Sequence, residues 1–206
     1  RRTQRPVARW PPLVPPVMAD DAGGAGDAGD AGEPSEPNPT ASRPPVLLDV
    51  MLGTLTRYLR MCGYDAAYAL DREIEADERI LSLAAAEGRA VVTRDRELAA
   101  RATRREAVPD GTLLSERDVL DQLRELDAAG FRIELAAEPA RCGSCNGPVE
   151  RVGGAGVDER VTDADRPDYV PDDVGADRPG WRCRECGQWF WKGSHWADVA
   201  SRLDGL

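Results

Sequence analysis

Four of the five cysteines form two pairs with the spacing of metal-binding knuckles. Two residues separate Cys142 from Cys145 and Cys183 from Cys186, and 37 residues lie between the pairs. Four thiolates saturate a zinc ion, so we expect a closed, structural zinc site. The intervening stretch exceeds the roughly 15–20 residues of compact motifs, but a long loop is inserted at low entropic cost. A rubredoxin-like iron site is the rival, because soft sulfur ligands also accept iron.

Three aspartates fall where apolar segments end or helical ones begin. Asp49 closes the apolar run VLLDV, Asp95 follows the run AVVT, and Asp77 opens the segment DERILSLAAAEG. Ligands of open parallel sheets bind beyond the carboxyl ends of the strands. Carboxylates that converge there repel one another unless a cation joins them, and hard oxygen ligands suit Mg²⁺ or Mn²⁺. We therefore predict a Mg or Mn site at Asp49, Asp77 and Asp95 that activates water for phosphodiester hydrolysis.

A structural interpretation stands beside this one. Asp77 and Asp95 both sit where an aspartate commonly caps a helix. Asp49 is harder to explain structurally, because a carboxylate within an apolar strand is costly to bury unless it is paired or metal-bound. Glu116 and Asp118 follow the fourth predicted strand and are candidates for a fourth acidic group.

The stretch FWKGSHW, residues 190–196, contains the chain's only lysine, Lys192, and its only histidine, His195. Four of the five tryptophans lie between residues 181 and 196. These rings either form a miniature core for a small zinc module or a platform on which RNA bases stack. For Trp191, Lys192 and His195 we expect RNA contacts that position the substrate without cleaving it.

Three arginines are further candidates for RNA binding. Arg57 and Arg60 lie on the first predicted helix, and Arg94 precedes Asp95. Each could hold a phosphate, or could be solvated or paired with surface acids.

The elements that must position these residues alternate between strand and helix. Short apolar strands are predicted at 46–50, 64–69, 90–93 and 111–115, and helices at 52–63, 77–88, 94–104 and 115–130. The first helix places Leu52, Leu55, Leu59 and Cys62 on one face. Asp77 is expected as the N-cap of the second helix, and Ser115 as the start of the fourth. The alternation predicts an α/β fold with a parallel sheet covered on both faces.

The ends of the chain differ in composition from this region. Residues 1–45 are rich in Gly, Ala, Asp and Pro and are predicted to be disordered, whereas 140–206 are rich in Gly, Pro, Cys and Trp. The basic start changes to an acidic stretch at Met18, which we interpret as the true initiator. A basic arm that touches RNA is the alternative.

The charge balance indicates the cellular setting. There are 37 acidic and 27 basic residues, for a net charge of -10. Such acidity with one lysine favours a halophile, with GC-rich coding bias as the alternative. No apolar run approaches the roughly 20 residues of a membrane span, and no signal-peptide core is visible. We expect a cytoplasmic protein, where paired cysteines favour metal over disulfide.

Three segments together resemble the Mut-seven C-terminal RNase domain family: DVMLGTLTRYLRMCGYD at 49–65, DERILSLAAAEGRAVVTRDREL at 77–98, and RCGSCN with CRECGQWFWKGSHW in the C-terminal part. The resemblance implies a PIN-like nuclease domain at 46–135 joined to a zinc ribbon at 140–206. It implies a metal-dependent ribonuclease that acts on RNA, with the PIN-type acidic positions on Asp49, Asp77 and Asp95. A non-catalytic RNA-binding or RNA-processing partner is the alternative, and a protein–protein adaptor is a third hypothesis.

Overall fold

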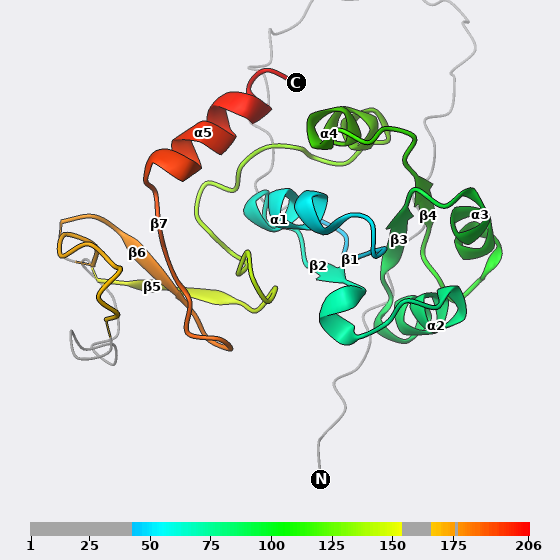
Figure 1. Cartoon of the computed structure of the whole chain (residues 1–206), viewed down its shortest axis with the longest axis horizontal. Coiled ribbons are helices and arrows are strands. Elements are labelled where there is room, and N and C mark those ends of the chain that lie inside the picture. The colour runs from blue at the N-terminus through cyan, green and yellow to red at the C-terminus, as the bar shows by residue number, and fades with distance from the viewer. Residues whose placement is uncertain (1–42, 154–165, 176) are drawn as a thin grey trace, which may run out of the picture. The chain divides into compact units, whose positions relative to one another are not determined.

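Strands and helices alternate through the first half of the computed structural model, which describes residues 43–153, 166–175 and 177–206 (Figure 1). The strands are β1 (Val46–Leu48), β2 (Ala66–Tyr68), β3 (Ala90–Thr93) and β4 (Gly111–Leu113). The helices are α1 (Gly53–Met61), the short 3-10 helix η1 (Leu70–Arg72), α2 (Asp77–Glu87), α3 (Arg96–Arg104) and α4 (Val119–Ala128). The predictions for residues 1–42, including a start at Met18, lie outside the described residues.

The four strands form one parallel sheet in the order β2-β1-β3-β4. This confirms the predicted α/β class. Strand β2 lies on one side of β1, and β3 lies on the other side. The carboxyl ends of β1 and β3 therefore flank a topological switch point, the place where open parallel sheets bind ligands.

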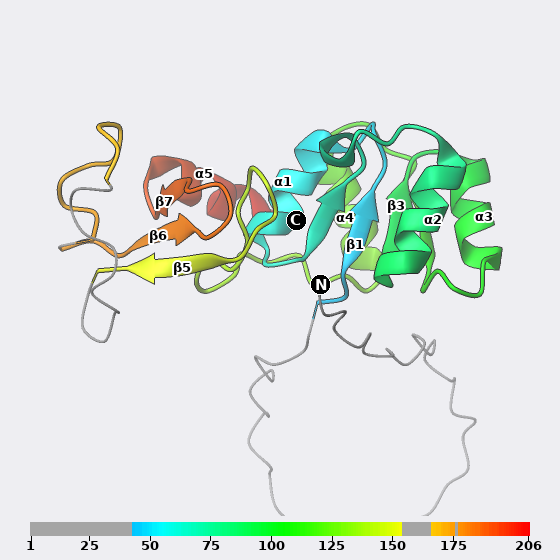
Figure 2. The ribbon, with the colours of Figure 1, turned by 90° about the horizontal axis from the view of Figure 1, so that it is seen from below.

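Apolar side chains on both faces of the sheet build two cores. Val46 and Leu48 of β1 pack in one core with residues of α1 and α4, whereas Leu47 points to the opposite core with residues of α2 and α3. Successive residues of a strand face opposite sides, so a buried parallel strand is apolar throughout. Figure 2 shows the resulting layers, with α2 and α3 beside β3.

Helix α1 has the apolar face that its sequence predicts. Leu52, Leu55, Leu59 and Cys62 are all buried. Burial raises the pKa of the Cys62 thiol to about 12, so this residue packs as a small neutral side chain.

Two helix starts differ from the prediction. The N-cap of α2 is Ala76, which makes no side-chain cap, and Asp77 is the first helical residue. Helix α4 begins at Val119, not Ser115, because the side chain of Asp118 accepts the backbone N–H of Leu120 at 2.8 Å. The cap at Asp118 satisfies a free N–H of the first turn and so sets the start of the helix.

The C-terminal part forms a second, antiparallel sheet. Its strands are β5 (Val149–Val152), β6 (Gly180–Cys183) and β7 (Trp189–Trp191), followed by helix α5 (Ser194–Leu203). Val199 and Leu203 of α5 are buried in the same core as Leu55 and Leu59 of α1. The ribbon helix thus completes the core on one face of the parallel sheet. Within the described residues, no helix has the length and apolar character that a membrane crossing requires.

Asp65, just before β2, joins the two sheets. Its carboxylate accepts hydrogen bonds from Arg89 Nη1 and from Asn146 Nδ2, both at 2.7 Å, and lies 3.1 Å from Arg141 Nη2. The Asn146 side chain also accepts the backbone N–H of Ala66 at 3.0 Å. Burial raises the pKa of Asp65, but Arg89, Asn146 and Arg141 lower it more, so the pKa lies below its ordinary value.

Replacing Asp65 tests this junction. A carboxyl whose pKa falls on folding stabilises the protein above its unfolded pKa of about 3.9, and that stabilisation is lost as the pH falls through the folded value. We expect Asp65→Asn to lower the free energy of unfolding by about 2 kcal/mol at pH 7. The difference from the wild type should shrink as the pH drops below about 4. Urea unfolding at several pH values measures this, with the exposed Asp204→Asn as control, and a difference independent of pH would contradict it.

Candidate functional site

The four paired cysteines converge as predicted. The sulfur atoms of Cys142 and Cys186 lie 3.6 Å apart, those of Cys145 and Cys183 lie 3.5 Å apart, and all four lie within 4.8 Å of one another. Zn–S bonds of about 2.3 Å in a tetrahedron give sulfur separations of about 3.8 Å. A disulfide needs about 2.05 Å, and none of these cysteines forms one. The geometry fits one four-coordinate zinc ion.

Backbone N–H groups near Cys183 favour its thiolate form, the form that binds a cation. The N–H groups of Glu185 and Cys186 lie 3.4 and 3.5 Å from Cys183 Sγ. Burial raises the pKa of Cys183, but these donors and the neighbouring thiols bring it down to about 7. Burial raises the pKa of Cys142 and Cys145. A cation would hold all four as thiolates, because a coordinating thiol is deprotonated.

Arg60 clamps the first knuckle to the parallel sheet. Its Nη1 donates to the carbonyl oxygens of Gly143 at 3.0 Å and Ser144 at 2.9 Å. Its Nε donates to Ala66 O at 2.9 Å, and its Nη2 pairs with Asp71 at 2.9 Å. The side chain is 3% exposed. Arg60 is predicted to contact RNA, but in the structure its donors are occupied inside the protein.

Asp49 and Asp95 lie at the switch point and share one hydroxyl. Thr93 Oγ1 donates to Asp49 Oδ2 at 2.7 Å and accepts the backbone N–H of Asp95 at 2.9 Å. The other Asp49 oxygen accepts the N–H of Val50 at 2.6 Å. Asp95 Oδ1 caps α3 by accepting the N–H groups of Glu97 and Leu98. The structure therefore brings Asp49 and Asp95 to adjacent strand ends, linked through Thr93.

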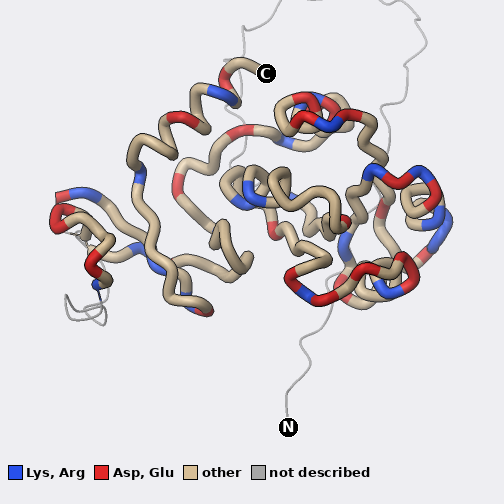
Figure 3. Tube along the Cα trace, viewed as in Figure 1, with Lys and Arg blue, Asp and Glu red and all other residues tan. Residues whose placement is uncertain are grey.

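The structure does not bring Asp77 into this arrangement. Its carboxylate lies 3.1 Å from Arg101 Nη1 on α3, and Arg101 also pairs with Glu78 at 2.8 Å. Figure 3 shows acidic and basic residues interleaved along α2 and α3, where these pairs form. Of the described residues, only the four cysteines place three or more ligand atoms close enough together for a metal ion.

Sequence reasoning overlooked three polar residues at this edge. Thr93 donates to the Asp49 carboxylate and accepts the backbone N–H of Asp95. Tyr68 ends β2, and Asp71 follows in η1. Tyr68 donates its hydroxyl proton to Val50 O at 2.6 Å. Burial raises the Tyr68 pKa, and the charges of Asp71 and Asp49 raise it further. An acid two residues after the predicted strand 64–69 was the available signal for Asp71.

The other residues that the sequence offered for metal or RNA binding differ in whether their side chains have hydrogen-bond partners within the protein. Glu116 is exposed, and Asp118 caps α4. Arg94 directly precedes Asp95, and its Nε is buried without a hydrogen-bond partner in the described part of the chain. Lys192 donates to Ala137 O at 2.6 Å.

The tryptophans of the C-terminal part differ in how deeply they are buried. Trp181 and Trp189 are buried, and Trp189 packs with Val152, Val170 and Val174 in a small core. The Lys192 ammonium lies over the rings of Trp181 and Trp196, at 5.9 and 5.6 Å from their centroids. Trp189 is therefore part of a small core, as the miniature-core interpretation expects, whereas Trp181 is buried outside that core.

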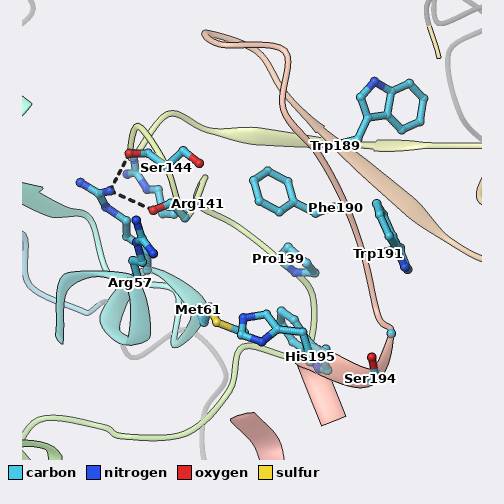
Figure 4. Close-up of a pocket in the computed structure, with 14 residues that line it drawn as sticks. Arg57, Met61, Pro139, Arg141, Ser144, Trp189, Phe190, Trp191, Ser194 and His195 are labelled. Carbon is cyan, nitrogen blue, oxygen red and sulfur yellow. Dashed lines mark hydrogen bonds between the residues drawn. The ribbon is translucent and has the colours of Figure 1, made fainter. Parts of the chain in front are cut away.

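A cavity of about 500 Å³ lies between α1 and the ribbon (Figure 4). Four of the six residues predicted to contact RNA line this cavity: Arg57, Arg60, Trp191 and His195. Phe190 and Pro139 form a wall across from Arg57. Pockets of this size accept small molecules or single units of a polymer.

A match to a known protein family covers both sheets of the chain. A family model of the Mut7-C RNAse domain matches residues 44–203, from just before β1 to the last residue of α5. The chain belongs to the Mut7-C RNAse domain family. The matched region includes both sheets, the aspartates at the strand ends and the four cysteines. No curated protein and no solved structure matches the chain.

Zinc content and thermal stability test the cysteine site of this Mut7-C RNAse domain. We expect one zinc ion per chain by elemental analysis. Because α5 shares the core of the parallel sheet, releasing the metal should lower the Tm of the whole unit by more than about 10 °C. Cys186→Ser should lose zinc, whereas Cys62→Ala, a matched cysteine outside the cluster, should retain it. The assignment would be contradicted by one iron ion per chain in place of zinc, or by a Tm that stays the same when the metal is removed.

Proposed function

We propose that the chain is a metal-dependent ribonuclease that hydrolyses RNA phosphodiester bonds at the carboxyl ends of β1 and β3. The observation that carries the proposal is the position of Asp49. The residue is 5% exposed and stands at the switch point of the sheet, and its carboxylate has no cationic partner among the residues described. Membership of an RNase domain family supports RNA as the substrate.

The side chains at this edge suit a hard cation. The Asp49 carboxylate accepts hydrogen bonds from two neutral donors, Thr93 and Val50, but these leave its negative charge unbalanced, and a bound cation would balance it. Asp95 uses Oδ1 to cap α3, so its other oxygen remains to share a cation with Asp49. We propose Asp49 and Asp95 as the main ligands of Mg²⁺ or Mn²⁺. Asp77 joins them only if Arg101 releases it.

Bound Mg²⁺ or Mn²⁺ would supply an activated water and stabilise the leaving oxygen of the phosphodiester. The chain's own residues prepare that site. Thr93 bonds the Asp49 carboxylate and the backbone N–H of Asp95, and the first turn of α3 holds the Asp95 carboxylate, so both side chains are held at this edge. His195, the only histidine, lies on α5, so proton transfer at the strand ends falls to carboxylates and water.

Two arginines without an ion-pair partner among the described residues, Arg57 and Arg94, offer the positive charge that the RNA backbone needs. We propose that Arg94 contacts phosphate beside Asp95 and that Arg57 contacts it from α1. On the ribbon side we propose Trp191, Lys192 and His195. Phosphate contacts of this kind position a strand without reading its sequence.

A non-catalytic RNA-binding partner is the second candidate. The ion pair between Asp77 and Arg101 favours it, because that pair keeps one predicted ligand away from the other two. Such a protein would bind RNA equally well with Asp49 or Asn at position 49 and would cleave nothing.

Cleavage time courses separate the two candidates. We would incubate structured and single-stranded RNA with the wild type in high KCl with Mn²⁺. Asp49→Asn should reduce the rate by at least about 100-fold, because it removes a metal ligand, and Thr93→Val should reduce it by about 10- to 100-fold through misplacement of the carboxylates. The measurement is the initial rate of product formation, with folding and zinc content checked in each variant.

The matched control is Asp127→Asn, which changes an exposed aspartate on α4 and should cleave like the wild type. Equal cleavage by Asp49→Asn would place the active site elsewhere. Tight binding without cleavage would favour the non-catalytic partner, and neither binding nor cleavage would favour the adaptor hypothesis.

A further inference from the structure

The cavity between α1 and the ribbon has a charge opposite to that of the chain. The chain carries 37 acidic and 27 basic residues, but the 14 residues lining the cavity include three arginines, one histidine and no Asp or Glu. Arg60 and Arg141 pair with Asp71 and Asp65 outside the lining. Arg57 is exposed and has no ion-pair or hydrogen-bond partner within the described residues. The cavity is therefore suited to an anion.

Strand alternation gives the cavity an aromatic wall. Trp189 belongs to the small ribbon core, and Trp191 packs against it. Because successive side chains of a strand point to opposite faces, Phe190 between them points away from that core. Figure 4 shows Phe190 and Pro139 across the cavity from Arg57. Phe190 is half-buried, stands opposite Trp181 in the pairing of β6 with β7, and lines the cavity, so part of its ring can contact a ligand.

A flat apolar wall opposite an unpaired guanidinium matches one chemical unit, an aromatic base joined to a phosphate. Base stacking on aromatic side chains and phosphate contacts from arginine are the two interactions that hold single-stranded nucleic acid. A volume of about 500 Å³ is sufficient for one nucleotide. We propose that the cavity binds one nucleotide of single-stranded RNA, with its base against Phe190 and its phosphate on Arg57.

Helix α1 connects this cavity to the acidic strand ends, and here the inference rests on the proposed ribonuclease function. Gly53 and Arg57 are four residues apart, so they lie on one face of α1, about 6 Å apart along its axis. A Cβ atom at Gly53 would lie 3.0 Å from the Tyr68 hydroxyl, and that hydroxyl contacts the loop after Asp49. An RNA strand held in the cavity would thus pass along α1 toward Asp49, so the cavity holds a nucleotide beside the one that is cleaved.

Binding measurements test the cavity without requiring cleavage. We would use zinc-loaded Asp49→Asn as the background and follow the fluorescence polarisation of a labelled uridine hexanucleotide over a KCl series. Phe190→Leu keeps the apolar volume but removes the stacking ring, and should weaken binding by roughly 5- to 100-fold. Arg57→Gln should reduce the slope of log affinity against log salt by about 0.7, the share of one phosphate contact.

Arg79→Gln is the matched control, because Arg79 is an exposed arginine on α2 outside the cavity, and it should bind like the background protein. Unchanged affinity in Phe190→Leu, with zinc and Tm intact, would overturn the inference. Competition by uridine monophosphate as strong as by the hexanucleotide would also overturn it, in favour of a free-nucleotide site. Cleavage retained by Asp49→Asn would instead refute the proposed function and leave the binding result standing.

Discussion

The buried guanidinium of Arg60 is the interaction on which the rest of the structure depends. It contacts three parts of the chain that are far apart in sequence: the start of β2, the first cysteine knuckle and Asp71 beyond the end of β2. A buried cation is tolerated only when its donors are satisfied, and here carbonyl oxygens and one carboxylate do so. The planar fork of arginine reaches several acceptors at fixed angles, which a lysine ammonium cannot reproduce. This one side chain thus holds knuckle, helix and strand together, beside the contacts of Asp65 and of α5.

This clamp gives the zinc site a role beyond holding the ribbon together. The carbonyl groups that Arg60 binds belong to Gly143 and Ser144, between the first two cysteines. Their orientation depends on the knuckle, and the knuckle depends on its metal. Arg60 also holds Asp71, whose charge acts on Tyr68 at the acidic edge. The cysteine cluster is thereby connected, through the hydrogen bonds of Arg60 and the charge of Asp71, to the strand ends where we propose the chemistry.

Local patterns in the sequence predicted the local features well. The spacing of Leu52, Leu55 and Leu59 predicts α1, and the apolar runs predict the parallel strands, because burial on both faces leaves little room for polar residues. The spacing of the two CxxC pairs predicts that all four cysteines come together. The sequence did not predict contacts between residues that are far apart in the chain. Arg101 captures Asp77 across 24 residues, and Arg60 meets carbonyls more than 80 residues away. Such pairings depend on how helices and loops pack, and no short window of sequence contains that information.

The placement of α5 has a consequence for the order in which the protein matures. Val199 and Leu203 of α5 lie in the core that covers one face of β1, beside residues of α1 and α4. A ribosome makes α5 only after every strand of the parallel sheet has been made. Domains usually fold as their chains emerge, N-terminal part first. In this protein α1 and α4 can cover that face early, but the part of the core that α5 fills stays open until the cysteine-containing segment before α5 has also been made.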